Sequence, residues 1–196
     1  MPERDVASNE ALWTTRLSLR RPSRTDIEAI YRIHSDRRAC AHNPSDMLAD
    51  PADAERRFVR WSGHWEQHGF GYWTVHGSPD LPDDHPLGFC GVKLMRLHGR
   101  IVLNLFYRLD PRIWGKGVAT EAAGAVLRWA VTHLPDRTVI ARVRPENTAS
   151  LKVVTRIGLR RARQLDTIGY DGPELIYTSN GWARTSRRRA DPPGSR

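Results

Sequence analysis

The sequence predicts a single mixed α/β domain of the α+β type, and three observations support this. The chain has 196 residues, which fits one domain because domains commonly hold about 100–200 residues. Strand-like and helix-like segments alternate along it without an internal repeat. A glycine-containing loop at 114–120 joins a strand-like run to a helix-like run. We therefore expect helices segregated among antiparallel and parallel strands.

The first half of the chain predicts a strand, two helices and the start of a hairpin. Residues 17–20 alternate as a strand does, and the Ser-Arg-Thr-Asp run at 23–26 resembles a capping box ahead of an apolar helical stripe. Asp50 and Pro51 supply an N-cap and a first helical residue for a second amphipathic helix. The aromatic and β-branched run 72–76 then predicts a strand.

The second half continues the alternation after a turn-forming run at 77–84, which is rich in Pro, Gly and Asp. The expected strands are 87–94, 100–109 and 138–143, with last strands over 159–163 and 173–178. A helix is expected after Gly117, with its apolar stripe over 122–134, and a shorter helix over 147–157.

Composition narrows the class of protein. Hydrophobic residues make up 39% and are interleaved with charge, so no run approaches the ~18 apolar residues of a membrane span. The N-terminus lacks the basic and apolar blocks of a secretory signal, and we expect a cytoplasmic protein. Two cysteines, Cys40 and Cys90, are too few for a disulfide scaffold and have no neighbouring zinc ligands, so no metal is expected.

The net charge of +9 suits either a phosphate-bearing ligand or a solvated surface. Five arginines lie in a C-terminal segment that also holds Pro and Gly, a composition that does not order itself. We therefore expect an N-terminal extension over 1–13, one domain over 14–182 and a disordered basic tail over 183–196.

The loop Trp114–Thr120 is the segment best suited to binding an anionic ligand. Backbone N–H groups and the positive end of the helix dipole converge there on an anion, and glycine lets a phosphate approach the backbone. Glycines in such a turn also serve packing alone. The loop is not a nucleoside-triphosphate loop, because Gly117 rather than Ser or Thr follows Gly115 and Lys116.

Two motifs in register give a resemblance to a known family. The run from Tyr107 to Ala122 resembles the acetyl-CoA motif of the GNAT superfamily of N-acetyltransferases, in the branch of the RimJ and RimL ribosomal-protein enzymes. A second block, 142–150 followed by 157–159, resembles the family's later signature, and the resemblance spans about 15–178. It implies acetyl-CoA as donor and a mixed, mostly antiparallel sheet of about seven strands, splayed beside its fourth strand.

The resemblance also implies roles for individual residues. Tyr107 and Leu109 would offer backbone groups to the pantetheine arm, Asn147 would hydrogen-bond it, and Ser150 would lie near the sulfur. Asn147 equally suits an N-cap, and Ser150 is also acceptable within the first helical turn. The pyrophosphate would be held by the loop residues Trp114, Gly115, Lys116, Gly117, Val118, Ala119 and Thr120.

The sequence departs from the family at two catalytic positions. Asn104 stands where many relatives have a glutamate base, and Val154 stands where many have a tyrosine acid. Ser150 is then the remaining family candidate for protonating the thiolate. Four histidines at 34, 42, 76 and 98 titrate near neutral pH but are as readily surface or packing residues, so no base is assigned.

We expect the acceptor to be a primary amine, either a protein N-terminus or a small molecule, and the basic surface argues mildly against a polycation. Asn104 and Trp73 are substrate-site candidates, although Trp61, Trp65 and Trp73 equally suit the core. The alternatives are a catalytically degenerate acyl-CoA sensor and a nucleic-acid-binding module, the latter disfavoured because no stacking platform accompanies the charge. A monomer or a homodimer is expected, without a membrane or a specific nucleic acid as partner.

Overall fold

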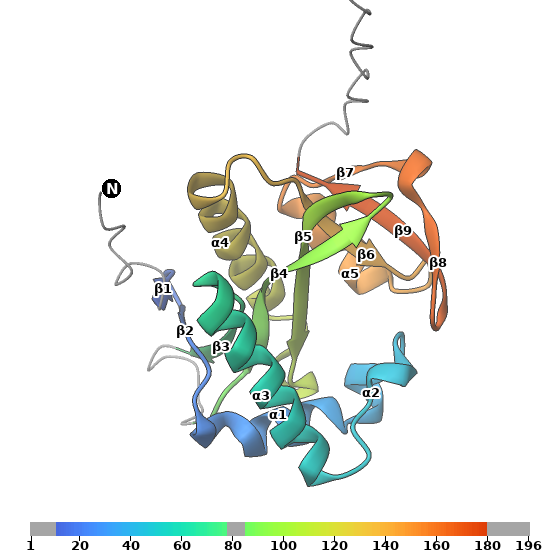
Figure 1. Ribbon diagram of the computed structural model, residues 1–196. Helices are drawn as coiled ribbons and strands as arrows, with labels where there is room; N and C mark the ends of the chain where they lie inside the picture. Colours follow the sequence, from blue (N-terminus) through green and yellow to red (C-terminus); the bar gives the residue numbers. More distant parts are fainter. Residues whose placement is uncertain (1–10, 78–84, 180–196) are drawn as a thin grey trace, which may run out of the picture.

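The computed structural model describes residues 11–77 and 85–179. Figure 1 shows a central sheet with helices on both faces. The strands are β1 (Ala11–Trp13), β2 (Leu17–Arg20), β3 (Tyr72–Gly77), β4 (Gly88–Leu97), β5 (Arg100–Leu109), β6 (Val139–Val143), β7 (Arg160–Arg161), β8 (Thr167–Gly169) and β9 (Gly172–Thr178). The helices are α1 (Ile27–His34), α2 (Arg37–Cys40), α3 (Pro51–His68), α4 (Val118–His133) and α5 (Thr148–Arg156), with 3-10 turns η2 (Arg24–Asp26), η3 (Pro44–Asp46), η4 (Pro111–Ile113) and η5 (Arg163–Leu165).

The predicted mixed, mostly antiparallel sheet is confirmed. Its strand order is β1-β2-β3-β4-β5-β6-β9-β7, with β8 paired to β9. Among these pairs only β5 and β6 run parallel. A parallel pair needs a crossover connection, and α4 supplies it.

The described residues form nine strands rather than about seven. The two additional strands, β1 and β8, have three residues each. Residues 11–13, expected in the N-terminal extension, therefore belong to the sheet. The strand expected over 159–163 is reduced to β7, after which the chain turns through η5. The expected loop at 78–84 and the tail at 183–196 lie outside the described residues.

The core lies on both faces of the sheet. Alternate residues of β4 and β5 point to opposite faces, so Cys90 and Leu105 pack with α4, whereas Phe89 and Phe106 pack with α1 and α3. The helix α4 is buried along one stripe that includes Ala122, Val126 and Ala130. This arrangement presents the first turn of α4 to the end of β5.

Helix boundaries follow the expected capping chemistry. The Asp50 carboxylate accepts the N–H of Asp53 at 2.9 Å and begins α3, and Gly69 ends it at φ 72°. Before α1, the Asp26 carboxylate accepts the N–H of Ser23 at 2.8 Å and pairs with Arg20 at 2.7 Å. Local sequence thus fixes both helices that cover one face.

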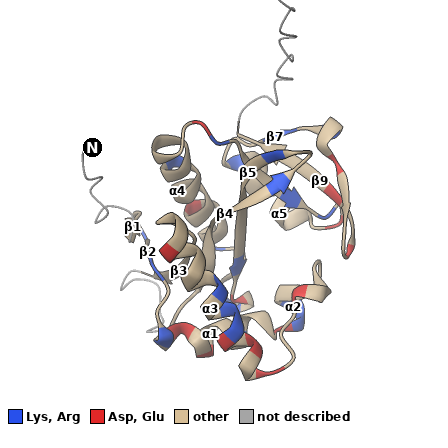
Figure 2. Cartoon of the chain, in the orientation of Figure 1, with Lys and Arg blue, Asp and Glu red and all other residues tan. Residues whose placement is uncertain are grey.

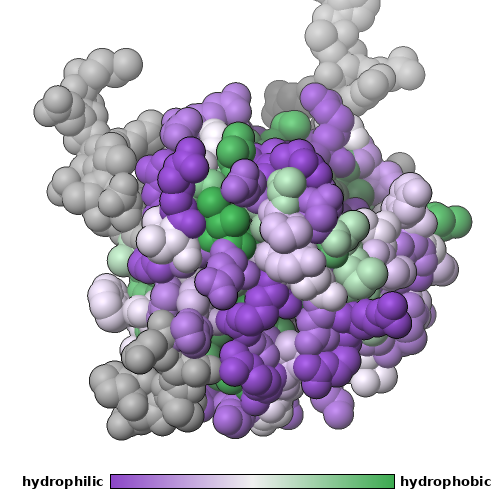
Figure 3. All heavy atoms as spheres, turned by 90° about the horizontal axis from the view of Figure 1, so that it is seen from below, coloured by the Kyte–Doolittle hydropathy of each residue, from purple (hydrophilic) through white to green (hydrophobic). Residues whose placement is uncertain are grey.

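Among the described residues, no helix is both long and apolar enough to cross a membrane. Figure 3 shows one face of the molecule, which is hydrophilic over most of its area, with hydrophobic residues in small separate groups.

Candidate active site

The strands β5 and β6 separate after two residue pairs. Leu103 pairs with Val139 and Asn104 with Ile140, and the register ends there. On its other side β5 stays paired with β4 as far as Leu109. The sheet therefore opens into a V between residues 105–109 and 141–144, with its vertex at Asn104; we call this opening the splay.

Backbone groups of β5 face the splay. The N–H of Leu103 donates to the carbonyl of Thr138 beside β6, whereas the N–H of Asp110 donates to Leu87 on the opposite side. Since backbone groups alternate in direction along a strand, those of Leu105, Tyr107 and Leu109 point into the splay. Beyond Asn104, β6 pairs with none of them.

A cavity of about 400 Å³ occupies the splay. Its walls are the free half of β5, the residues of β6, the loop before α4 and the first turns of α5, and α2 with the following loop covers it. Its size is typical of small-molecule sites, which enclose ~300–1,000 Å³.

The loop at the start of α4 has the geometry of an anion site. Gly115 and Gly117 both adopt φ 78°, a left-handed conformation that favours glycine. The first N–H to bond back within the helix is that of Glu121, to the Gly117 carbonyl. The preceding N–H groups, from Val118 to Thr120, are therefore available at the positive end of the helix dipole.

A salt bridge and two hydrogen bonds hold this loop in place. Glu121 in the first turn of α4 pairs with Arg16 at 2.6 Å and accepts the Thr14 hydroxyl at 2.7 Å. Burial raises the pKa of Glu121, but the bonds from Thr14 and Arg16 outweigh it and lower that pKa. Arg16 also donates to the Lys116 carbonyl at 3.0 Å. The loop is thus fixed before any ligand binds.

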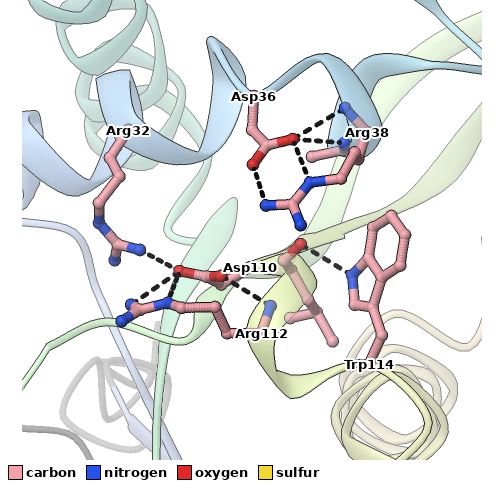
Figure 4. Close-up of polar contacts among 8 residues, drawn as sticks. Arg32, Asp36, Arg38, Asp110, Arg112 and Trp114 are labelled. Carbon is pink, nitrogen blue, oxygen red and sulfur yellow. Dashed lines mark hydrogen bonds and ion pairs between the residues drawn. The ribbon is translucent and has the colours of Figure 1, made fainter.

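Arg32 of α1 fixes Asp110, the residue that joins β5 to the segment before this loop (Figure 4). Asp110 accepts hydrogen bonds from both Arg32 and Arg112, and although burial raises its pKa, the bonds from Arg112 and Arg32 lower that pKa to about 2. Trp114 donates its indole N–H to the Leu109 carbonyl at 3.0 Å. One of the backbone acceptors predicted for the ligand is therefore already engaged by a loop side chain.

The helix α5 brings Asn147 and Ser150 to the cavity. The Asn147 side chain accepts the N–H of Ser150 at 3.0 Å, so the capping role is confirmed, and its amide N–H groups remain as donors. Tyr107 donates its hydroxyl to the Ser150 carbonyl at 3.3 Å. Burial, the largest influence, raises the pKa of Tyr107 to about 12. Val154 is fully buried in the core.

Most residues predicted to bind the cofactor come together here. The cavity lining includes Tyr107, Leu109, Trp114, Gly115, Gly117, Val118, Ala119, Thr120, Asn147 and Ser150. Lys116 is exposed and outside this lining, and only its carbonyl contacts Arg16. Asn104 lies at the vertex, with its side-chain oxygen buried and without a hydrogen-bond partner in the described structure.

The suggestion that Trp73 lines an acceptor groove is wrong. Its exposed fraction is 0%, and its ring packs against Trp65 and Trp129 at centroid distances of 5.1 Å. Trp61 and Trp65 are likewise core residues. Of the four histidines considered as bases, only His42 lines the cavity, while His34 is fully buried and its Nδ1 contacts the Ile30 carbonyl at 3.0 Å.

Sequence reasoning gave no role to several arginines of the cavity wall. Arg108 on β5 and Arg142 and Arg144 on and beside β6 line the splay, and Arg38 reaches it from α2. Arg142 and Arg144 belong to the second motif, so their spacing of two along a strand was a signal that both face one side.

These features define a class of protein: a splayed α/β domain with a preformed anion loop beside an unpaired strand edge. The family model described as "Acetyltransferase (GNAT) domain" matches residues 16–160. The chain belongs to the GNAT acetyltransferase family; it is an acyltransferase, and its donor is acetyl-CoA.

Two relatives are similar to this chain over more than half of its length. The protein YkkB of Bacillus subtilis is 28% identical over 123 residues, which cover 62% of this chain and 69% of YkkB. An N-acetyltransferase of Bacillus licheniformis, p20, is 26% identical over 78% of this chain and 83% of its own length.

Solved structures share the fold. An acetyltransferase from Agrobacterium tumefaciens superposes with a TM-score of 0.72 at 24% identity, covering 87% of this chain and 94% of that one. RimL, a ribosomal L7/L12 α-N-protein acetyltransferase solved with coenzyme A, superposes with a TM-score of 0.68 at 15% identity, covering 86% of this chain and 97% of RimL.

Proposed function

We propose that this protein is an N-acetyltransferase that moves the acetyl group of acetyl-CoA to a primary amine by direct attack on the thioester. The observation that carries the proposal is the single cavity joining the anion loop at α4 to the unpaired edge of β5. A ligand with a charged diphosphate and an amide-containing arm matches this pair of features.

The residues present fit acetyl-CoA. The N–H groups from Val118 to Thr120 suit its diphosphate, and the backbone of Tyr107 suits the amides of its arm. Four residues of extended strand separate Leu109 from Leu105, about 13 Å. An arm that follows β5 from the loop therefore brings its thioester toward the vertex at Asn104.

The protein's own groups supply two needs of the reaction. A backbone N–H on the β5 edge can stabilise negative charge that develops on the acetyl oxygen. The Ser150 hydroxyl can donate a proton to the departing thiolate. Asn104 cannot take a proton, and it lies at the vertex outside the cavity lining, so we assign no base; an amine that is neutral in part needs none.

The test is a calorimetric titration with acetyl-CoA, followed by thiol release on a panel of peptide N-termini and small amines. Gly117→Glu and Ala119→Glu should each abolish acetyl-CoA binding, because they place bulk and negative charge at the diphosphate. Gly99→Glu is the matched control, since Gly99 also adopts φ 78° but lies in the β4–β5 turn. Wild-type affinity for acetyl-CoA in both loop variants would contradict the assignment of this loop to the diphosphate.

A sensor that binds acetyl-CoA without turnover is the second candidate, favoured by Asn104 and Val154 in place of the family's base and acid. Tight binding without thiol release on any amine of the panel would support it. Release of one thiol per acetylated amine would instead support the enzyme.

A further inference from the structure

The charges around the cavity are of one sign. Its described lining includes six cationic side chains and no Asp or Glu. These are Arg38, Arg108, Arg142, Arg144, Lys152 and Arg156. A concave site lined by charges of one sign attracts ligands of the opposite sign.

The six cations fall into separate groups. Lys152 and Arg156 extend from α5, the helix packed beside α4, and suit the phosphates of acetyl-CoA. Arg108 shares the sheet face of Phe106, and Arg142 and Arg144 share that of Ile140, because alternate residues point the same way. This face is turned away from α4. Figure 2 shows basic residues at the free end of β5 and around β6.

The cations of the splay are not neutralised inside the cavity. Arg108 pairs with Asp46 at 2.7 Å, but Asp46 also pairs with Arg57 at 2.8 Å. The Asp46 side chain is 39% exposed, whereas that of Arg108 is 6% exposed. One carboxylate thus serves two guanidinium groups, so this cluster keeps a net positive charge beside the cavity.

Arg142 and Arg144 also pair with carboxylates, but only Arg144 repeats this pattern, because the Arg142 side chain is 37% exposed and that of Glu174 is 11% exposed. Arg142 pairs with Glu174 at 3.1 Å and Arg144 with Glu146 at 3.4 Å, and neither carboxylate lines the cavity. The ion pair with Glu146 is made by the buried Nε of Arg144, and the two terminal nitrogens of this guanidinium donate to the carbonyls of Pro173 and Asp171. The strands β5 and β6 thus present guanidinium groups on the face of the sheet opposite α4 and α5.

We infer that the acceptor is a primary amine that also carries a carboxylate or phosphate group, held by Arg108 and Arg142 while its amine points toward the vertex of the splay. This inference rests on the proposed acetyl transfer. The amine nitrogen forms the bond to the acetyl carbon as the C–S bond breaks; the amine loses a proton and the thiolate gains one. Guanidinium groups bind such anions through paired hydrogen bonds, and a polycation is repelled.

The experiment is a calorimetric titration of the CoA-saturated protein with matched amines, one of which carries an anionic group that the other lacks. The pairs are O-phosphoethanolamine against ethanolamine, β-alanine against β-alaninamide, and a peptide with glutamate against glutamine beside its N-terminus. The charged member of at least one pair should bind about tenfold more tightly, since a hydrogen bond to a charged group contributes about that factor. The arms separate a phosphate, a free carboxylate and a peptide as the source.

Arg142→Gln should reduce that preference about tenfold and leave the Kd for acetyl-CoA unchanged. Arg137→Gln, the same change on the exposed α4–β6 loop, is the control and should retain the preference. The inference is overturned if the uncharged members bind equally well or better, or if no charged amine binds the CoA-saturated protein. In either case, normal affinity for CoA would leave the assignment of the cofactor site intact. Failure to bind CoA overturns the proposed function itself.

Discussion

Ser150 occupies a position where structure and chemistry can be separated. Its N–H and carbonyl are both engaged, by Asn147 and Tyr107, while the side chain lines the cavity. Ser150→Ala should therefore retain the fold and the Kd for acetyl-CoA but lower kcat about 10²–10⁴-fold, the usual contribution of a positioned proton donor. Thr148→Ala removes a hydroxyl from the same helical turn outside the cavity lining and is the control. Steady-state thiol release checks both, and an unchanged kcat would exclude Ser150 as donor.

Trp73 illustrates an aromatic residue whose role the sequence left open. In a strand, alternate residues face the core, but a single sequence does not say which face another element covers. The structure places Trp73, whose exposed fraction is 0%, in the hydrophobic core that packs against α4. Trp73→Ala should lower the free energy of unfolding by about 3–5 kcal/mol. Urea denaturation measures this; a stable variant with altered acceptor preference would restore the substrate role.

At the scale of elements, long periodic segments were predictable and short ones were not. The strand over 100–109 matches β5 at both ends because ten residues carry a clear alternation. By contrast β1 and β8, with three residues each, have too few positions to show a period, and tertiary pairing alone forms them. The splay was implied by family resemblance; nothing local in 139–143 indicates that pairing ends after Ile140.

The hairpin of β8 and β9 contacts the loop that covers the cavity. Asp171 accepts the N–H of Ser45 at 3.1 Å and its hydroxyl at 2.6 Å, and the neighbouring Asp46 pairs with Arg108. Because these bonds are exposed, they contribute little to global stability, and Asp171→Ala should loosen only this loop. Hydrogen exchange of residues 42–47 should quicken several-fold, with α3 unchanged. Asp136→Ala in the α4–β6 loop is the control. Equal exchange in both variants would contradict a stabilising contact between Asp171 and Ser45.

At the scale of the whole molecule, buried histidines predict how stability depends on pH. Burial lowers the pKa of His34, His64 and His76, that of His64 to about 4, whereas an unfolded histidine titrates near 6.5. His64 is held neutral between two backbone groups, since its Nδ1 lies 2.7 Å from the Phe70 carbonyl and its Nε2 accepts the Leu94 N–H at 3.3 Å. Below pH 6.5 these histidines are protonated in the unfolded chain but stay neutral in the folded protein.

The stabilisation from these histidines is therefore complete above pH ~7 and is lost as the pH falls from about 6.5 toward 4, by up to about 1.4 kcal/mol per pH unit for each fully shifted group. The lowered pKa values of Asp26 and Asp110 act in a separate window, because their stabilisation is lost only below pH ~4. Urea unfolding at pH 7.5, 6.5, 5.5 and 4.5 should show a falling midpoint throughout, and His64→Gln should reduce the slope. A midpoint that stays constant down to pH 5 would mean that these imidazoles accept protons without leaving the core.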